Sequence, residues 1–520
     1  MVRLIVIGIA LVVAMGGFVY GFDSGIIATT LGQSSFKSYF YGPTLVNTSL
    51  SGAIVSVYNA GQAIGGLTSG FLADKFSRKY AMSAMALLSI VGAVLQTASV
   101  HVAMMIVGRL LAGIGCGSLL SVVPVYLAEA SQPDSRGFLV GLHGMMIAIG
   151  FGVANWVGYG GSYASSHAQW RTPLAMQIPI PILMMVGCIY IPFSPRWRRF
   201  TFLQNIPILF LVLTIDAVVQ QDRIEEAEKV LHKLHGIENE SLASQELIQI
   251  RQQLGFERSQ GSASWSFALK KMFSKQYLRR TATATFIVAM GQLSGSQVIQ
   301  NFQSIFYETV GFTGKTSLLI SGIYGMMGII GQIIYLTVVA DRWPRVRTLW
   351  IGSVLLSVMI AVCMALSAQY GSKDSQNENG ARGAIAMIFL YSALYAVFFN
   401  AMVWVVPSEL FPFFLRSKGL AFAVFTKSVI AIALSQITPI AIKNVSWRYY
   451  SLYIATNLTA GLIYFFFLPE TSGKSLEEIA ELFGDTLATE QIGSINVEEK
   501  MKAMEEQDGE HAHVEATKKA

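Results

Sequence analysis

One full charge, Asp23, interrupts the first long apolar run of the chain, in the stretch FVYGFDSGII (18–27). Two further charges, Arg109 and Lys427, also stand inside long apolar runs. An ionised group near the centre of a lipid bilayer costs about 2.5–3.5 kcal/mol on insertion scales, so it needs a partner, a water-filled cavity or a function. These residues are therefore the first candidates for chemistry.

A second set of charges repeats between the two halves of the chain. Each half follows an apolar run with an acid four residues before an arginine, and later places an acid seven residues before an arginine. Matched charged loops on one face suit a transporter that rocks one helix bundle against another. The alternative is helix caps and surface ion pairs, each worth about 0–1 kcal/mol. The pairs are Asp74/Arg78, Asp341/Arg345, Glu129/Arg136 and Glu409/Arg416.

The composition predicts a protein that lies in a lipid bilayer. Of the 520 residues, 53% are hydrophobic and 13% are charged, whereas soluble proteins carry about 25% charged residues. The net charge of +6 does not indicate nucleic acid, because the basic residues gather in loops between apolar runs. Cys116, Cys188 and Cys363 lie in apolar runs and suggest packing, neither disulfides nor a metal site. No nucleotide-binding loop or nucleophile–base motif is found, so we expect neither an enzyme nor a cofactor.

Runs of about 20 apolar residues predict membrane-spanning helices. The chain has twelve such runs, six on each side of a polar stretch, and the first is read as a retained helix because no cleavage site follows it. We expect an all-α membrane protein with two six-helix bundles. The runs are 4–30, 49–73, 79–99, 102–127, 137–159, 172–193, 281–308, 316–340, 348–368, 383–407, 418–440 and 450–468.

Lysine and arginine set the expected orientation. Most of them fall on the side that holds both termini, which predicts that both termini are cytoplasmic. The apolar stretch 200–219 would invert this pattern as a thirteenth span, so we interpret it as a surface segment or a translated intron. The expected division is 1–194 for the first bundle, 195–280 for a cytoplasmic linker with 200–219 as an atypical insertion, 281–468 for the second bundle and 469–520 for a cytoplasmic tail.

Eight motifs in order make the chain resemble the sugar-porter family of the major facilitator superfamily, in particular its members from filamentous fungi. The resemblance covers nearly the whole chain apart from 200–219 and about the last thirty residues. It implies the major facilitator fold and alternating access around a central site. The motifs are YGFDSG (20–25), DKFSRK (74–79), GRLLAGIGCG (108–117), PVYLAEASQPDSRG (124–137), PFSPRW (192–197), QLSG (292–295), PSELFP (407–412) and PETSGKSLEEIAELF (469–483).

The resemblance implies that Asp23 carries a proton and that Arg109 is its counter-charge. Desolvation favours the neutral carboxyl and a nearby guanidinium favours the carboxylate, so moving the two groups drives protonation or release. The alternative is a static Asp–Arg clamp in a uniporter. The eight paired charges named above are gate residues by resemblance, although Ser77 and Pro344 replace glycines usual in the family.

The expected substrate site departs from the family pattern. Lys427 and Ser428 stand where asparagine and tryptophan are usual, and Lys427 either snorkels to an interface or meets an anionic substrate. We expect a transported sugar, polyol or sugar acid, coupled to protons. Alternatives are import or export of a small carboxylated fungal metabolite, and a non-transporting nutrient receptor. The candidate substrate residues are Gln292, Gln297, Asn301, Phe399, Asn400, Lys427 and His143.

Two glycosylation sequons, at Asn47 and Asn444, lie near loops expected outside the cell, although such short patterns often go unused. The tail after 484 is polar and is expected to be disordered. The expected location is the plasma membrane, with lipid, protons and a small solute as partners.

Overall fold

The computed structural model describes residues 4–42, 47–131, 135–191, 265–309, 312, 314–370, 378–474, 479 and 482–483. Every regular element among these residues is a helix. Met1–Ile206 and Ala263–Ile479 form one unit by their internal contacts, and the helices discussed below all belong to it. The apolar stretch 200–219, most of the expected linker and the tail after 484 lie outside the described residues.

The first half of the unit contains the six spans expected before the linker, and a short helix, α2, follows the first of them. The sixth span is broken between two helices, the second of which begins with Pro179. The elements are α1 (Leu4–Gly32), α2 (Ser34–Tyr41), α3 (Thr48–Phe76), α4 (Arg78–Thr97), α5 (Val102–Ala130), α6 (Arg136–Gly161), α7 (Ala168–Ala175) and α8 (Pro179–Tyr190).

The second half begins after a short helix, α11 (Trp265–Met272), and contains the other six spans. Two of these spans are interrupted, one by a break between two α-helices and one by a short π-helical turn, η6, while another π-helical turn, η5, ends the span of α14. The elements are α12 (Lys275–Leu293), α13 (Ser296–Thr309), α14 (Lys315–Ile334), η5 (Tyr335–Val339), α15 (Arg345–Tyr370), α16 (Glu378–Tyr395), η6 (Ala396–Asn400), α17 (Met402–Leu410), α18 (Phe413–Val445), η7 (Ser446–Tyr449) and α19 (Tyr450–Phe467).

The helices match the twelve expected runs, and the predicted fold class is confirmed. Nine stretches of the described residues are long and apolar enough to cross a membrane. One of them, Leu415–Phe467, holds two expected spans, α18 and α19, joined by the turn η7. The remaining two expected spans are α3, which carries many small and polar residues, and the interrupted pair α12–α13.

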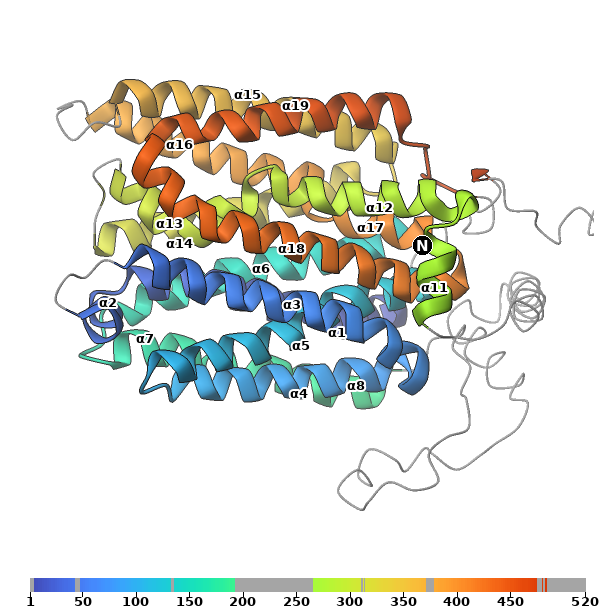
Figure 1. The fold of residues 1–520 in the computed structure, drawn as a ribbon, viewed down its shortest axis with the longest axis horizontal. Coiled ribbons are helices and arrows are strands. Elements are labelled where there is room, and N and C mark those ends of the chain that lie inside the picture. The colour runs from blue at the N-terminus through green and yellow to red at the C-terminus, as the bar shows by residue number, and fades with distance from the viewer. Residues whose placement is uncertain are drawn as a thin grey trace, which may run out of the picture. The chain divides into compact units, whose positions relative to one another are not determined.

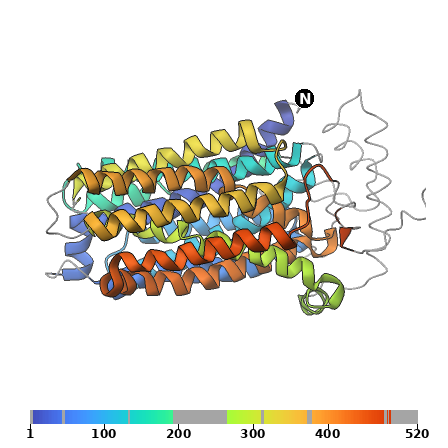
Figure 2. The same cartoon turned by 90° about the horizontal axis from the view of Figure 1, so that it is seen from above.

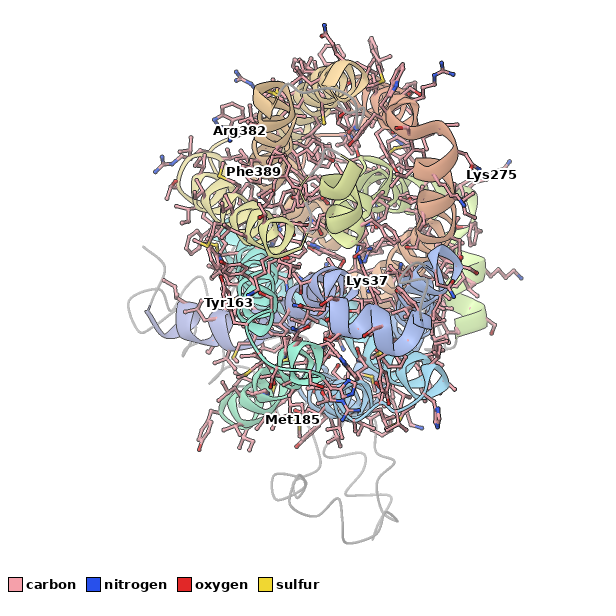
Figure 3. The ribbon with its side chains drawn as sticks, turned by 90° about the vertical axis from the view of Figure 1, so that its left-hand side faces the viewer. Lys37, Tyr163, Met185, Lys275, Arg382 and Phe389 are labelled. Carbon is pink, nitrogen blue, oxygen red and sulfur yellow. The ribbon has the colours of Figure 1, made fainter. Side chains whose placement is uncertain are left out.

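The two halves pack along each other, with α3 against α18 and α6 against α14 (Figures 1 and 2). Helices α3 and α18 run antiparallel, because Gly52 lies beside Gln436 whereas Gly70 lies beside Lys418. In an end-on view the first half, with Lys37, Tyr163 and Met185, lies on one side, and the second half, with Arg382 and Phe389, lies on the other (Figure 3).

One end of the helices collects buried arginines, and we call it the arginine end. The first residues of α4, α6 and α15 lie there, together with the start of α18. The opposite end carries α2 and α7, where Phe36 packs edge-to-face on the buried Trp170. The arginines that define the arginine end are Arg78, Arg136, Arg345 and Arg416, each 3% exposed or less.

A break between α12 and α13 opens the helical backbone beside the second-half core. Gly295 adopts a φ of +95°, in the left-handed region that favours glycine. The Ser294 carbonyl oxygen, freed by the break, accepts hydrogen bonds from the Tyr391 hydroxyl at 2.9 Å and from Asn457 Nδ2 at 3.1 Å. Broken helices at membrane depth are tolerated where protein or a cavity satisfies the backbone in this way.

We expect Gly295→Ala to lower the free energy of unfolding by about 1–3 kcal/mol, the range for a strained backbone position. A Cβ atom there would meet the Tyr453 ring at 2.9 Å and force a left-handed conformation on alanine. Thermal unfolding in detergent measures the change. The matched control is Gly383→Ala inside α16, where the new Cβ finds only Leu366 Cδ1 at 3.9 Å and stability should not fall. Equal melting temperatures for Gly295→Ala and the wild type would contradict the expectation.

Candidate functional site

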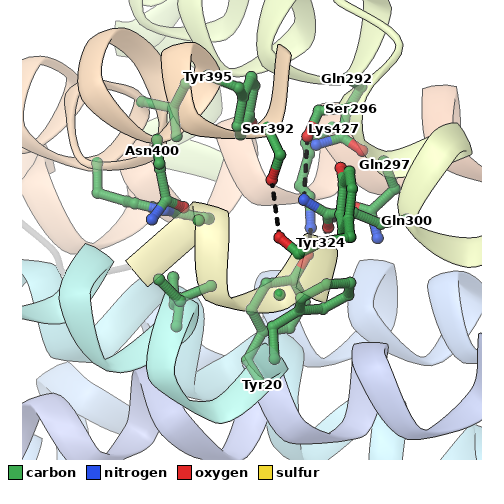
Figure 4. A pocket seen from close by; sticks show the side chains of 18 residues that line it. Tyr20, Gln292, Ser296, Gln297, Gln300, Tyr324, Ser392, Tyr395, Asn400 and Lys427 are labelled. Atoms are coloured by element: carbon green, nitrogen blue, oxygen red, sulfur yellow. Dashed lines mark hydrogen bonds between the residues drawn. The ribbon is translucent and has the colours of Figure 1, made fainter. Parts of the chain in front are cut away.

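A polar cavity of about 60 Å³ lies between the two halves (Figure 4). One water molecule needs about 10–15 Å³ measured in this way, so the cavity has room for several waters or a small solute. Its walls come from α1 and α6 of the first half and from α12–α14, α16–α18 and η6 of the second. The lining residues are Tyr20, Ile147, Ala148, Phe151, Gln292, Ser296, Gln297, Gln300, Tyr324, Gly325, Gly328, Ser392, Tyr395, Ala396, Asn400, Val403, Trp404 and Lys427.

The lining combines amides and hydroxyls with aromatic rings. Amides both donate and accept hydrogen bonds, as a solute rich in hydroxyl groups requires, and flat rings cover the apolar faces of such a solute. Four amides, from Gln292, Gln297, Gln300 and Asn400, reach the cavity together with several tyrosines. The arrangement suits a small polyhydroxylated molecule.

Lys427 is held in place by several polar contacts. Its Nζ donates to the Tyr20 hydroxyl at 3.2 Å and to Gln62 Oε1 at 2.9 Å, and it lies 4.8 Å from the centre of the Tyr20 ring. The Tyr20 hydroxyl in turn donates to Gln297 Oε1 at 3.1 Å. Because Lys427 belongs to α18 whereas Tyr20 and Gln62 belong to α1 and α3, these bonds join the two halves.

Asn400 forms a second polar link between the halves. It ends the π-turn η6, and such turns often occur at functional sites because they redirect a side chain. Its Nδ2 donates to the Gly144 carbonyl of α6 at 2.8 Å and to Gln332 Oε1 at 2.9 Å. The Asn400 carboxamide is thereby held beside the cavity.

Four of the seven predicted substrate residues line the cavity, namely Gln292, Gln297, Asn400 and Lys427. The other three are buried nearby but are not part of its wall. The Phe399 ring stacks on Tyr395 at 5.9 Å, and the His143 ring meets Trp404 edge-on at 5.8 Å. Asn301 is 4% exposed on α13.

Sequence reasoning missed several lining residues. Tyr20 lies three positions before Asp23, on the same face of α1, which is a signal that could have found it. Gln300 follows Gln297 by three positions and shares its face for the same reason. Tyr324, Tyr395 and Trp404 carry no comparable signal, because aromatic residues are common throughout the apolar helices.

Asp23 and Arg109 lie together, outside the cavity wall. Both are buried, with Asp23 3% exposed and Arg109 fully covered. Arg109 Nη1 donates to the main-chain carbonyl oxygen of Asp23 at 3.4 Å, while the Asp23 carboxylate accepts from the Cys116 thiol at 3.2 Å. The guanidinium also stacks over the Tyr58 ring, 4.1 Å from its centre.

The charged loops at the arginine end form ion pairs within each half. In the first half, Arg78 Nη2 lies 3.2 Å from Glu129 Oε1. In the second, Arg345 Nη2 lies 3.6 Å from Glu409 Oε1 and 3.5 Å from Asp341 Oδ1. The side chain of Asp74 lies outside the described part of the chain.

Asp341 links the second half to the first. Its Oδ2 accepts from the main-chain N–H of Phe138, in the first turn of α6, at 2.8 Å. Burial raises the pKa of the Asp341 carboxyl above its ordinary value, against the opposing effect of the neighbouring Arg345 guanidinium. The Gly137 position is tight, since a Cβ there would collide with Asp341 Oδ1 and approach Arg345 Nη2 to 2.8 Å.

The C-terminal segment after α19 completes this cluster. The Glu470 carboxylate accepts from the main-chain N–H groups of Arg345 and Val346 at 2.8 and 3.1 Å, which caps the start of α15. The Thr471 hydroxyl donates to Glu409 Oε2 at 2.9 Å. The other two predicted gate arginines bind main-chain oxygens nearby: Arg136 Nη1 reaches Lys474 O at 3.4 Å, and Arg416 Nε reaches Phe411 O at 3.3 Å.

The two sequons lie at the end opposite the arginine end. The Asn47 side chain accepts from the Leu50 N–H at 2.9 Å and caps the start of α3. Asn444 is exposed in the last turn of α18. Glycosylation of either stays a prediction.

Comparison with known proteins identifies relatives along almost the whole chain. Residues 9–483 match the family described as "Sugar (and other) transporter". The chain is 34% identical to the MFS-type transporter criB of Aspergillus cristatus, over 92% of this chain and 94% of that protein. It is 28% identical to a high-affinity glucose transporter of Kluyveromyces lactis, over 92% and 85% of the two chains.

Solved structures share the fold. The proton:xylose symporter XylE bound to 6-bromo-6-deoxy-D-glucose superposes with a TM-score of 0.76, covering 92% of this chain and 99% of that one at 23% identity. The inward-open conformation of XylE from E. coli gives a TM-score of 0.67 over the same shares of the two chains, again at 23% identity. The chain therefore shares its fold with these solved structures.

Proposed function

The chain belongs to the Sugar (and other) transporter family, and from this premise we propose that it moves a sugar or a sugar-like solute across the plasma membrane by alternating access, coupled to protons. It is a multi-pass membrane protein of the major facilitator fold. The relatives named above include a glucose transporter and a proton:xylose symporter, which makes a small polyhydroxylated solute the natural candidate.

The observation that carries the proposal is the position of the cavity between two halves that touch on both sides of it. Toward the arginine end, the Phe138 N–H meets Asp341 across the halves. Toward the other end, Gln303 Nε2 donates to Asn155 Oδ1 at 2.8 Å, and Gly325 packs closely on Gly152. Opening one set of contacts while keeping the other exposes the cavity to one side of the membrane at a time, which is alternating access.

Asp23 and Arg109 support proton coupling. Arg109 Nε and Nη2 have no hydrogen-bond partner among the described residues, so the guanidinium has donors to spare for the Asp23 carboxylate. A carboxylate that meets this guanidinium in one state and only the Cys116 thiol in another changes its proton affinity between the states. In the proposed cycle, Asp23 binds a proton when the cavity faces outside and releases it when the cavity faces the cytoplasm.

The arginine end is proposed to face the cytoplasm. Lysine and arginine accumulate in the loops of that end, and the positive-inside rule then places both termini in the cytoplasm. In this orientation the clusters at Arg78 and Arg345 act as the cytoplasmic gate. The proposed division into bundles 1–194 and 281–468, linker 195–280 and tail 469–520 follows the same topology, with the stretch 200–219 kept inside the linker.

Uptake in a yeast strain that lacks its own hexose carriers tests the proposal. We expect saturable uptake of at least one member of a labelled panel of hexoses, pentoses, polyols and sugar acids. The rate should rise as the external pH falls, and accumulation should collapse when a protonophore is added, because the proton gradient drives transport. The empty vector is the control.

Two outcomes would contradict parts of the proposal. An uptake rate that changes with neither the external pH nor the protonophore would indicate a uniporter with a static Asp23–Arg109 clamp. A protein that reaches the plasma membrane but takes up no solute of the panel would overturn uptake of a sugar-like solute and favour the alternatives of an exporter or a nutrient receptor.

A further inference from the structure

Lys427 brings a positive charge into a cavity whose wall is otherwise uncharged. None of the other 17 residues that line the cavity, all of them described, is an acid or a base. Lys427 is 1% exposed, so its ammonium is removed from bulk water. One alternative from the sequence was that this side chain reaches a membrane interface. In the structure its Nζ instead binds Tyr20 and Gln62 in the interior.

The partners of the ammonium are neutral. A hydroxyl, an amide oxygen and the face of a tyrosine ring satisfy part of its hydrogen-bonding capacity and attract the charge weakly. Among the described residues, no carboxylate forms an ion pair with it within 4.0 Å. Burying a cation without an anionic partner costs free energy. A solute that carries an anionic group would lower this cost by pairing with the ammonium.

We infer that the transported solute carries a carboxylate that pairs with Lys427, so that its class is the polyhydroxylated acids, such as a sugar acid, rather than neutral sugars. The inference rests on the proposed transport function. The amides of Gln297, Gln300 and Asn400 bind the hydroxyl groups, while the Lys427 ammonium binds the carboxylate in place of one of its present neutral partners.

A structural role for Lys427 makes a different prediction. Because its bonds to Tyr20 and Gln62 cross between the halves, Lys427 could serve as a latch for the closed cavity. Loss of a latch changes transport of every solute alike, whereas loss of an anion site changes transport of acids selectively. Gln62→Met separates these roles, since it removes the 2.9 Å latch contact and leaves the ammonium in place. Gln62 is not one of the residues that line the cavity.

The test compares acids with neutral sugars or polyols of the same carbon skeleton. Uptake of D-glucuronate is measured against D-glucose, of D-galacturonate against D-galactose, and of D-gluconate against sorbitol, in the yeast strain described above. For the wild type we expect at least one acid to be transported with a higher kcat/KM than its neutral counterpart. A hydrogen bond to a charged group is worth enough to change binding by about 10- to 100-fold.

Variants then test whether the Lys427 ammonium causes the preference for the acid. Lys427→Asn should raise KM for the acid about 10- to 100-fold and leave the neutral sugar nearly unchanged. Lys427→Arg, which keeps the charge, and Gln62→Met should both retain the preference for the acid. Should Lys427→Asn fail to reach the membrane, the wild-type preference and the Lys427→Arg variant decide the matter.

The outcomes that overturn the inference are distinct from failure of the proposed function. Wild-type transport of neutral sugars with no preference for any acid would overturn the anion site and leave sugar transport standing. Equal losses for both classes in Lys427→Asn and Gln62→Met would assign Lys427 to the latch. Absence of uptake for every probe would overturn the proposed uptake function itself.

Discussion

Replacing Asp23 with asparagine is expected to abolish accumulation of the solute against its gradient. Asparagine is close to aspartate in shape, but its amide neither binds nor releases a proton at physiological pH. The proton gradient can therefore no longer drive transport. Asp23 is 3% exposed, and its carboxylate accepts a hydrogen bond from the Cys116 thiol, which can also donate to an amide oxygen. The packing of α1 against α5 should therefore survive the change.

The expected effect is large because the proton gradient contains considerable free energy. One pH unit corresponds to about 1.36 kcal/mol, and a membrane potential of 100 mV adds about 2.3 kcal/mol for each charge. Together, about 3.7 kcal/mol permits about 500-fold accumulation of a neutral solute that moves with one proton, whereas a singly charged anion moves with that proton without net charge, so that one pH unit permits about 10-fold accumulation. With Asp23→Asn the inside concentration should not exceed the outside concentration at the plateau of uptake.

Exchange across the membrane provides the control for this variant. Proteoliposomes loaded with unlabelled solute should still exchange it for labelled solute in Asp23→Asn, since the cavity wall does not include Asp23. Cys116→Ala removes the thiol donor and should retain accumulation, because the carboxyl group itself remains. Accumulation by Asp23→Asn at the wild-type level would remove Asp23 from the coupling mechanism.

The spans could be predicted from the sequence because their signal is local. A run of about 20 apolar residues must become a helix in lipid, where no water satisfies the backbone. The interruptions could not be predicted in the same way. The break at Gly295 and the π-turn at Ala396–Asn400 lie inside predicted spans, and the freed backbone at the break depends on partners far along the chain, Tyr391 and Asn457.

The candidate site was predictable where a charge revealed it or where the family resemblance indicated the position, as for Gln292, Gln297 and Asn400. Asp23, Arg109 and Lys427 stand out because each is expensive in lipid. A neutral residue becomes part of the cavity through the rotation of its helix, which the apolar pattern does not specify. His143 and Asn301, expected in the site, are buried outside its wall, whereas Tyr324 contributes to it without any sequence signal.

The ion pairs of the gate also could not be predicted from the sequence. The repeat in the sequence groups Glu129 with Arg136 and Glu409 with Arg416, according to spacing along the chain. In the structure, each of these acids pairs with the arginine at the start of another helix, Arg78 or Arg345. The repeat therefore identified the participating residues, but the spacing along the chain did not predict these two ion pairs.

Asp341→Gly is expected to open the arginine end of the protein. Asp341 adopts a φ of +57°, which glycine accepts without strain, so the substitution removes the carboxylate and leaves the turn intact. The main-chain N–H of Phe138 then loses the acceptor that reaches it from the other half at 2.8 Å. A hydrogen bond to a charged group contributes about 1.5–3 kcal/mol, so the equilibrium should move about 10- to 150-fold toward the open arginine end.

Two spin labels measure this opening directly. Lys75 in α3 and Arg347 in α15 are exposed, lie at the arginine end and belong to different halves, so cysteines at these positions report the separation of the halves there. In a background without the three native cysteines, pulsed electron spin resonance should show a longer distance gaining population in Asp341→Gly. KM for external solute should rise as well, because fewer molecules present the outward-facing site.

Asp341→Asn is the matched control. Asparagine also tolerates a positive φ and keeps an oxygen that can accept from Phe138, so it should lie between the wild type and Asp341→Gly. Arg78→Gln breaks an ion pair that lies wholly within the first half and should leave the cross-half bond at Phe138 in place. If the distances in Asp341→Gly match those of the wild type, the contact between Asp341 and α6 does not keep the arginine end closed. The packing of α3 against α18 and of α6 against α14 must then keep it closed.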